Sequence, residues 1–127
     1  MELRFKNHYT REEANALLPQ IRRWLDQLNR LRENLHRIEK RLSGLTESGN
    51  DIGGETVNHW IRHLADIQEI LSEFQRREIF IKDLERGLLD FPAIIGGREV
   101  FLCWEQDEEQ VEFWHELETG FGGRERL

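Results

Sequence analysis

Residues 10–42 read TREEANALLPQIRRWLDQLNRLRENLHRIEKRL, and the spacing of their apolar side chains decides the fold. These side chains recur at alternating intervals of three and four residues, at Ala14, Leu17, Ile21, Trp24, Leu28, Leu31, Leu35, Ile38 and Leu42. Such a heptad pattern lines one side of a helix, as in a coiled coil. Thr10 and Glu13 form a capping-box pattern, in which each side chain accepts a hydrogen bond from the other's backbone amide. The sequence therefore predicts a long helix that begins just after Thr10.

A second heptad pattern follows a loop at residues 43–54 that is rich in glycine, serine and asparagine. Its apolar side chains are Val57, Trp60, Leu64, Ile67, Leu71 and Phe74. We expect this helix to continue to about Arg86, because the glycine that follows is a natural helix terminator. Two heptad helices joined by a short loop fold back on each other, so residues 10–86 are predicted to form an antiparallel helical hairpin.

The apolar stripe of this hairpin is wider than the seam between two helices. Pairing Leu42 with Val57 sets the antiparallel register of the seam. Leu18, Leu25 and Ile61 lie beside the seam and need a further surface to cover them. We expect that surface to come from the C-terminal segment, from a second copy of the chain, or from another protein.

Residues 88–117 are richer in apolar side chains than the helices and have a different period. Turn residues divide them into three predicted strands, at Phe91–Ile95, Glu99–Glu105 and Val111–Leu117. These strands are expected to form a small three-stranded antiparallel β meander, with Trp104 paired to Val111. This register gathers the apolar side chains on one face together with His115, and it places Cys103 on the opposite face. The predicted fold class is therefore α+β.

The length of 127 residues is typical of a single domain, here residues 1–127, with 118–127 as a C-terminal tail. No apolar run is long enough to span a membrane, and the first residues do not resemble a signal peptide. The chain has one cysteine, so it can form neither an internal disulfide nor a cysteine-cluster zinc site. We expect a cytoplasmic protein with no membrane partner.

The net charge of −7 is unevenly distributed along the chain. Residues 1–50 carry ten basic and seven acidic side chains, whereas residues 51–127 carry eight basic and eighteen acidic ones. Arg23, Arg30 and Arg37 form a basic stripe along the first helix, which we expect to pair with acidic side chains of the second helix or of another subunit. We expect no nucleic-acid partner, because residues 51–127 are strongly acidic and binding phosphates requires a broad basic surface.

Short motifs throughout the chain carry a resemblance to a known family. They are Tyr9-Thr10-Arg11-Glu12-Glu13-Ala14-Asn15, Leu17-Leu18-Pro19, Ile81-Lys82-Asp83, Gly87-Leu88-Leu89-Asp90-Phe91-Pro92-Ala93, Gly97-Arg98-Glu99-Val100, Leu102-Cys103-Trp104, Trp114-His115-Glu116, Gly120-Phe121 and Gly123-Arg124. With these motifs the chain resembles the uncharacterised bacterial family known as domain of unknown function 2203. The resemblance covers almost the whole chain and implies a shared fold. It implies no function, because that family has no established activity.

Ionisable residues in the apolar C-terminal segment are the candidate ligand-binding site. A histidine among apolar groups and near a carboxylate can bind a metal ion or act as a general base. The candidates are Asp90, Arg98, Trp104, His115, Glu116 and Arg124, with His115 and Asp90 as the possible metal ligands. The alternative is a core histidine whose hydrogen bonds are satisfied by Asp90 or by backbone. A reactive pair of Cys103 with His115 is not favoured, because the predicted register separates them.

Two classes of function remain open from the sequence. The first is a non-enzymatic interaction module that self-associates through the hairpin into a homo-dimer, or that binds an unidentified protein partner. The second is a small-ligand or metal site on the meander around His115, which includes the possibility of catalysis. The sequence favours the first class and leaves open whether the protein is an enzyme and whether it binds a cofactor.

Overall fold

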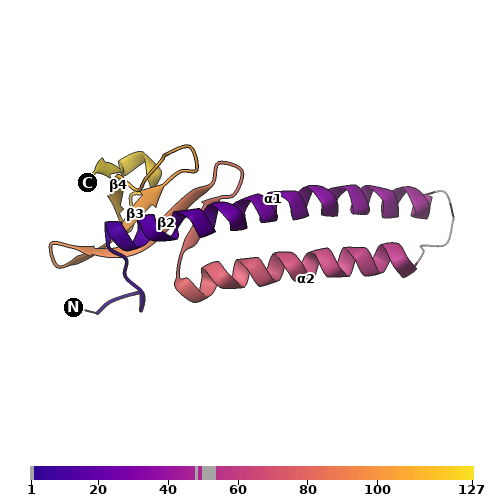
Figure 1. Ribbon diagram of the computed structural model, residues 1–127, viewed down its shortest axis with the longest axis horizontal. Coiled ribbons are helices and arrows are strands. Elements are labelled where there is room, and N and C mark those ends of the chain that lie inside the picture. The colour runs from indigo at the N-terminus through magenta and orange to yellow at the C-terminus, as the bar shows by residue number, and fades with distance from the viewer. Residues whose placement is uncertain (1, 48, 50–53) are drawn as a thin grey trace.

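The computed structural model describes residues 2–47, 49 and 54–127, which form a long helical hairpin joined at one end to a β-sheet (Figure 1). The elements are α1 (Arg11–Glu47), α2 (Gly54–Arg77), β1 (Phe80–Asp83), β2 (Leu88–Ile95), β3 (Arg98–Trp104), β4 (Phe113–Glu116), the 3₁₀ turn η1 (Phe121–Gly123) and β5 (Glu125–Arg126). The predicted α+β class is confirmed. The loop predicted at residues 43–54 begins later, because α1 continues to Glu47; most of the remainder lies outside the described residues.

The capping box at the start of α1 is confirmed. The Oγ1 atom of Thr10 accepts a hydrogen bond of 3.1 Å from the amide of Glu13, and Oε1 of Glu13 accepts one of 3.1 Å from the amide of Thr10. α1 is 37 residues long, which corresponds to about 55 Å at about 1.5 Å per residue. No helix of the described residues is both long and apolar enough to cross a membrane.

The two halves of the hairpin have different environments. The N-terminal half of α1 packs on the sheet and buries Ala14, Leu18, Ile21, Leu25 and Leu28. The sheet thus covers Leu18 and Leu25, two of the apolar side chains that lie beside the seam between the helices. Residues 29–47 and 54–73, here called the distal hairpin, project away from the sheet (Figure 1). No described residue of the distal hairpin is buried.

Contacts between the helices agree with the predicted antiparallel register. The rings of Trp24 and Phe74 lie 5.3 Å apart near the sheet. At the other end, Leu42 and Val57 line the same surface hollow. α2 therefore runs alongside the C-terminal part of α1, as Figure 1 shows.

α2 ends at Arg77, so the prediction that it continues to about Arg86 is wrong. Glu78 follows in the left-handed region, with φ of 55°, which costs energy for a residue with a side chain. Its carboxylate offsets part of this cost by accepting hydrogen bonds of 2.8 Å from the backbone amides of residues 6 and 7. The apolar residues 79–81, rich in β-branched and aromatic side chains, then lead into β1 instead of a further helical turn.

The sheet has five antiparallel strands in the order β1-β2-β3-β4-β5, two more than the predicted three-stranded meander. The predicted strands correspond to β2, β3 and β4. The first additional strand, β1, comes from the segment that was predicted to be helical. The second, β5, comes from the predicted tail at residues 118–127, where the amide of Leu127 also donates to the carbonyl oxygen of Glu112 at 2.8 Å.

The pairing of β3 with β4 differs by one residue from the predicted register. Phe101 lies opposite His115, and Cys103 lies opposite Phe113. Because side chains alternate along a strand, this shift exchanges the faces of β4 relative to β3. The prediction that Cys103 and His115 lie on opposite faces is therefore wrong: they share one face of the sheet.

The two faces of the sheet are covered by different parts of the chain. One face packs on α1 through Leu89, Phe91, Val100, Leu102 and Trp104. The other, here called the outer face, carries Phe80, Lys82, Asp90, Phe101, Cys103, Phe113 and His115. The N-terminal segment lies over part of the outer face, with the ring of Phe5 at 5.4 Å from the rings of Phe80 and of Phe101. The C-terminal turn η1 packs against β4.

Candidate functional site

The centre of the outer face is a buried pair of ionisable side chains, Asp90 on β2 and His115 on β4. Asp90 is 3% exposed and His115 is 2% exposed. Oδ1 of Asp90 lies 2.9 Å from Nε2 of His115. Nδ1 of His115 lies 2.6 Å from the carbonyl oxygen of Glu116, and it must donate there because a carbonyl oxygen only accepts.

This geometry limits the acid–base chemistry of His115. Both ring nitrogens are engaged, one with a backbone carbonyl and one with the Asp90 carboxyl group. A general base needs a ring nitrogen that is free to take a proton from a substrate. His115 is therefore a buried histidine whose hydrogen bonds are made by Asp90 and by a backbone carbonyl, which is the alternative to a general base that the sequence left open. The two contacts fix the orientation of the ring.

Cys103 on β3 completes a cluster of three buried groups. It is opposite Asp90 in the sheet, and one ligand atom from each of Asp90, Cys103 and His115 lies within 4.8 Å of the other two. Burial raises the pKa of the Cys103 thiol to about 11, although hydrogen bonding to the Arg124 guanidinium acts in the opposite direction. At neutral pH the thiol keeps its proton, so Cys103 is not an activated nucleophile.

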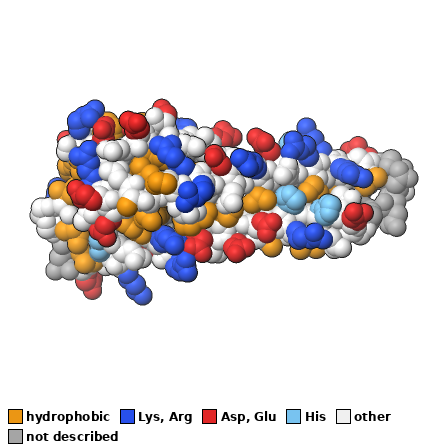
Figure 2. Space-filling view, viewed as in Figure 1, with side chains coloured by type: hydrophobic (Ala, Val, Ile, Leu, Met, Phe, Trp, Pro, Cys, Tyr) orange, Lys and Arg blue, Asp and Glu red, His pale blue; other side chains and the backbone are white. Residues whose placement is uncertain are grey.

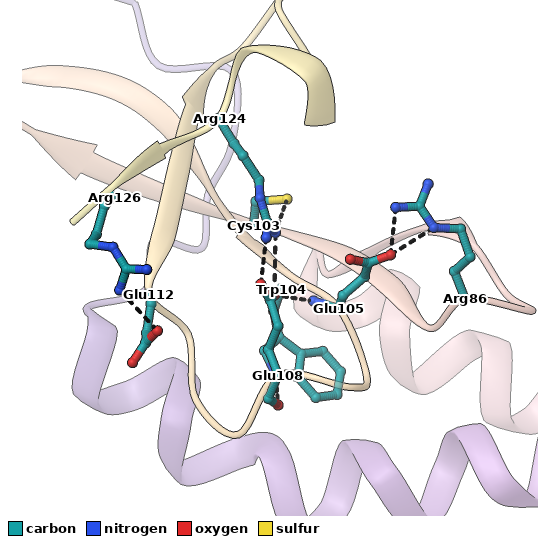
Figure 3. A network of polar contacts seen from close by, with 8 residues as sticks. All are labelled: Arg86, Cys103, Trp104, Glu105, Glu108, Glu112, Arg124 and Arg126. Carbon is teal, nitrogen blue, oxygen red and sulfur yellow. Dashed lines mark hydrogen bonds and ion pairs between the residues drawn. The ribbon is translucent and has the colours of Figure 1, made fainter.

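Arg124 links the C-terminal turn to Cys103, one member of this cluster (Figure 3). Its Nη1 atom lies 3.9 Å from Sγ of Cys103 and 3.2 Å from Oε1 of Glu108. The guanidinium also lies over the ring of Phe113, at 3.8 Å from the ring centroid, and over Phe121 at 4.4 Å. The ion pair with Glu108 balances the positive charge of Arg124 close to the cluster.

A surface pocket of about 240 Å³ borders the Asp90–His115 pair. Its lining includes Lys82, Asp90, Phe101, His115, Glu118 and Phe121. Lys82 extends over the rings of Phe80 and Phe101, with Nζ 5.6 and 5.8 Å from their centroids. Small molecules or water can therefore approach the buried pair from one side.

The structure separates the other candidates from this cluster. Arg98 and Glu116 form an exposed ion pair of 2.8 Å where β3 begins and β4 ends. Trp104 faces α1 in the core, and its Nε1 donates to the carbonyl oxygen of Glu108 at 3.0 Å. Of the six predicted site residues, only Asp90, His115 and Arg124 therefore have side chains in the Asp90–Cys103–His115 cluster or in contact with it.

The loop between β3 and β4 is tied to α1 by contacts that the sequence does not reveal. Arg22 donates to the backbone carbonyls of residues 106 and 108, both at 2.8 Å, and lies over the ring of Trp104. The amide of Val111 donates to Oδ1 of Asn15 at 2.7 Å. These partners are far apart in sequence and no motif links them, so only the fold brings them together.

Glu99 anchors the N-terminal segment, a second feature that the sequence does not reveal. Its carboxylate accepts hydrogen bonds from the amides of Arg4 at 2.7 Å and Phe5 at 3.0 Å, and Oε2 lies 2.8 Å from Nε2 of His8. Burial alone would raise the pKa of Glu99, but the hydrogen bonds from Arg4, His8 and Phe5 outweigh it and lower the pKa below its usual value.

Comparison with known protein families matches residues 7–127 to the family described as "Uncharacterized conserved protein (DUF2203)". The chain belongs to this family. The match confirms the resemblance seen in the sequence and includes the hairpin, the sheet and the Asp90–Cys103–His115 cluster. No curated protein and no solved structure matches the chain.

Proposed function

We propose that this DUF2203 protein is a self-association module in which the distal hairpin packs against the distal hairpin of a second copy. The single observation that carries this proposal is the exposure of two apolar side chains of α2, Leu64 in the seam and Ile61 beside it. Ile61 is 53% exposed and Leu64 is 39% exposed, although Leu64 belongs to the heptad pattern. Two helices alone cannot bury a stripe of this width, whereas a four-helix arrangement can.

Charge on the distal hairpin favours a second copy as the partner. Residues 29–47 carry five basic and three acidic side chains, whereas residues 54–73 carry one basic and four acidic ones. α1 of one copy therefore complements α2 of another. A hollow of about 550 Å³ between the helices is lined by Trp24, Arg30, Leu31, Asp66, Glu69 and Ile70, so it offers both apolar contact and both signs of charge.

The size of the distal hairpin is consistent with a specific interface. About twenty residues of each helix give a face about 30 Å long, and two adjacent helices are about 20 Å wide. This footprint of ~600 Å² approaches the ~800 Å² per partner of a standard interface. Figure 2 shows hydrophobic side chains along the hairpin, interspersed with basic and acidic ones.

Sedimentation equilibrium of the full chain and two variants tests this proposal. We expect the wild type to sediment at twice its chain mass of 15.3 kDa. The double substitution Ile61→Lys with Leu64→Lys replaces both exposed apolar side chains by charged ones. If each side chain contributes about 1 kcal/mol per copy, the variant loses about 4 kcal/mol of dimer stability, a ~1,000-fold weaker association.

The matched control is Ile94→Lys, because Ile94 is 47% exposed but lies on the sheet. We expect this variant to remain dimeric, which separates loss of a defined interface from a general effect of added charge. A wild type that stays at 15.3 kDa over the whole concentration range contradicts the proposal. So does dissociation by Ile94→Lys to the same extent as by the double variant.

A further inference from the structure

Self-association through the hairpin does not account for the three buried ionisable side chains on the outer face of the sheet. Asp90, Cys103 and His115 come from three neighbouring strands and are all buried. Each is of a type that ligates metal ions, and their ligand atoms converge within 4.8 Å. We propose that these three side chains bind one divalent transition-metal ion of the zinc class, independently of the hairpin interface.

The orientation of His115 is the first argument for this proposal. Metal-bound histidines donate their second ring N–H to a carbonyl or a carboxylate, which fixes the ring and its tautomer. Nδ1 of His115 makes such a bond, at 2.6 Å to the carbonyl oxygen of Glu116. Nε2 then points toward Asp90, where a metal ion would replace the shared proton.

The spacing of the ligand atoms is the second argument. Zinc binds nitrogen and oxygen at about 2.0–2.2 Å and sulfur at about 2.3 Å, so tetrahedral ligand atoms lie about 3.3–3.8 Å apart. The separation of 2.9 Å between Nε2 of His115 and Oδ1 of Asp90 must widen by about half an ångström. The widest separation, at most 4.8 Å, must close by about one ångström. Changes of this size need only small side-chain rotations.

The surroundings supply the remaining requirements. The pocket of about 240 Å³ that borders Asp90 and His115 gives access for the ion and room for a water molecule as the fourth ligand. Carboxylate and thiolate together neutralise a divalent ion, and Glu108 neutralises Arg124 beside them. One thiolate and one imidazole favour zinc, cobalt or nickel over magnesium and calcium, which prefer oxygen ligands.

Cobalt(II) absorption spectroscopy on the full chain, freed of metal with a chelator, tests the proposal. We expect one Co²⁺ per chain and a thiolate-to-cobalt charge-transfer band, which zinc abolishes by displacing the cobalt. Cys103 is the chain's one cysteine, so the band assigns the ligand without a variant. Cys103→Ala should lose the band and lower Co²⁺ affinity at least tenfold.

The matched control is the double variant His59→Ala with His63→Ala, which removes a histidine pair spaced for metal binding on α2. It should keep both the band and the affinity. The proposal is overturned if the wild type binds no cobalt, if it binds cobalt without the thiolate band, or if the His59/His63 variant loses the signal. Should Cys103→Ala fail to fold by circular dichroism, the wild-type spectrum still decides between these outcomes.

Discussion

Replacing Glu99 by glutamine should release the N-terminal segment from the outer face. Three donors converge on this carboxylate: the amides of Arg4 and Phe5 and the ring of His8. Hydrogen bonds to a charged group contribute ~1.5–3 kcal/mol each, about twice the contribution of neutral ones. The amide of Glu99→Gln keeps one acceptor oxygen but lacks the charge. We therefore expect a loss of about 2 kcal/mol in the free energy of unfolding at pH 7.

The pH dependence of the stability provides an independent test of the role of Glu99. The folded-state pKa of Glu99 is lower than usual, so its contribution to stability is present above the ordinary glutamate pKa of about 4.3. It is lost as the pH falls through the lowered value, because the carboxylate becomes protonated. The stability difference between wild type and Glu99→Gln should therefore be present at neutral pH and disappear as the pH falls through the lowered pKa of Glu99.

Urea unfolding followed by tryptophan fluorescence, repeated from pH 7 to pH 3, measures this difference. Glu118→Gln is the control, because Glu118 also forms an ion pair with the N-terminal segment. Its side chain is 85% exposed, and its Oε1 atom lies 3.7 Å from Nη2 of Arg4. We expect this variant to lose at most about 0.5 kcal/mol. The reasoning is refuted if Glu99→Gln is as stable as the wild type at pH 7, or if its deficit persists unchanged at pH 3.

Three further predictions concern the buried groups. Asp90→Ala should lower the free energy of unfolding by about 3 kcal/mol, because it leaves the buried imidazole of His115 without its partner. Asp90→Asn keeps an oxygen acceptor and should lower it by less. Equal losses for the two variants in chemical denaturation contradict this prediction. Cys103 of metal-free protein should react slowly with iodoacetamide at pH 7 and much faster only on unfolding or near pH 11, so rapid labelling at pH 7 contradicts its burial. Arg22→Ala should loosen residues 106–108 and red-shift the fluorescence of Trp104, and an unchanged emission spectrum argues against that contact.

The parts of the fold that depend on local sequence could be predicted from it. The capping box at Thr10 and the heptad periods identify the helices, because the relevant contacts lie within a few residues or repeat regularly. The end of α2 could not be predicted, because it depends on Glu78 taking a left-handed conformation. That conformation is supported by hydrogen bonds to the distant residues 6 and 7.

The candidate site was predictable only in part, for a reason that lies in the sheet. β3 is apolar on both faces, with Leu102 and Trp104 on one and Phe101 and Cys103 on the other. Alternation therefore does not distinguish two registers that differ by one residue. The predicted pairing of His115 with Asp90 is confirmed, but the predicted register put Cys103 on the wrong face and therefore did not bring the three residues of the cluster together.

Amide hydrogen exchange of the wild type at two protein concentrations decides whether a second copy covers the distal hairpin. Exchange of residues 29–47 and 54–73 should slow as the concentration rises, because association removes local opening of these helices. Exchange of β2 and β3 through local opening should not change, because these strands pair within the sheet and lie outside the proposed interface. Identical exchange of the distal hairpin at both concentrations, with the chain remaining at 15.3 kDa, would contradict self-association through this surface.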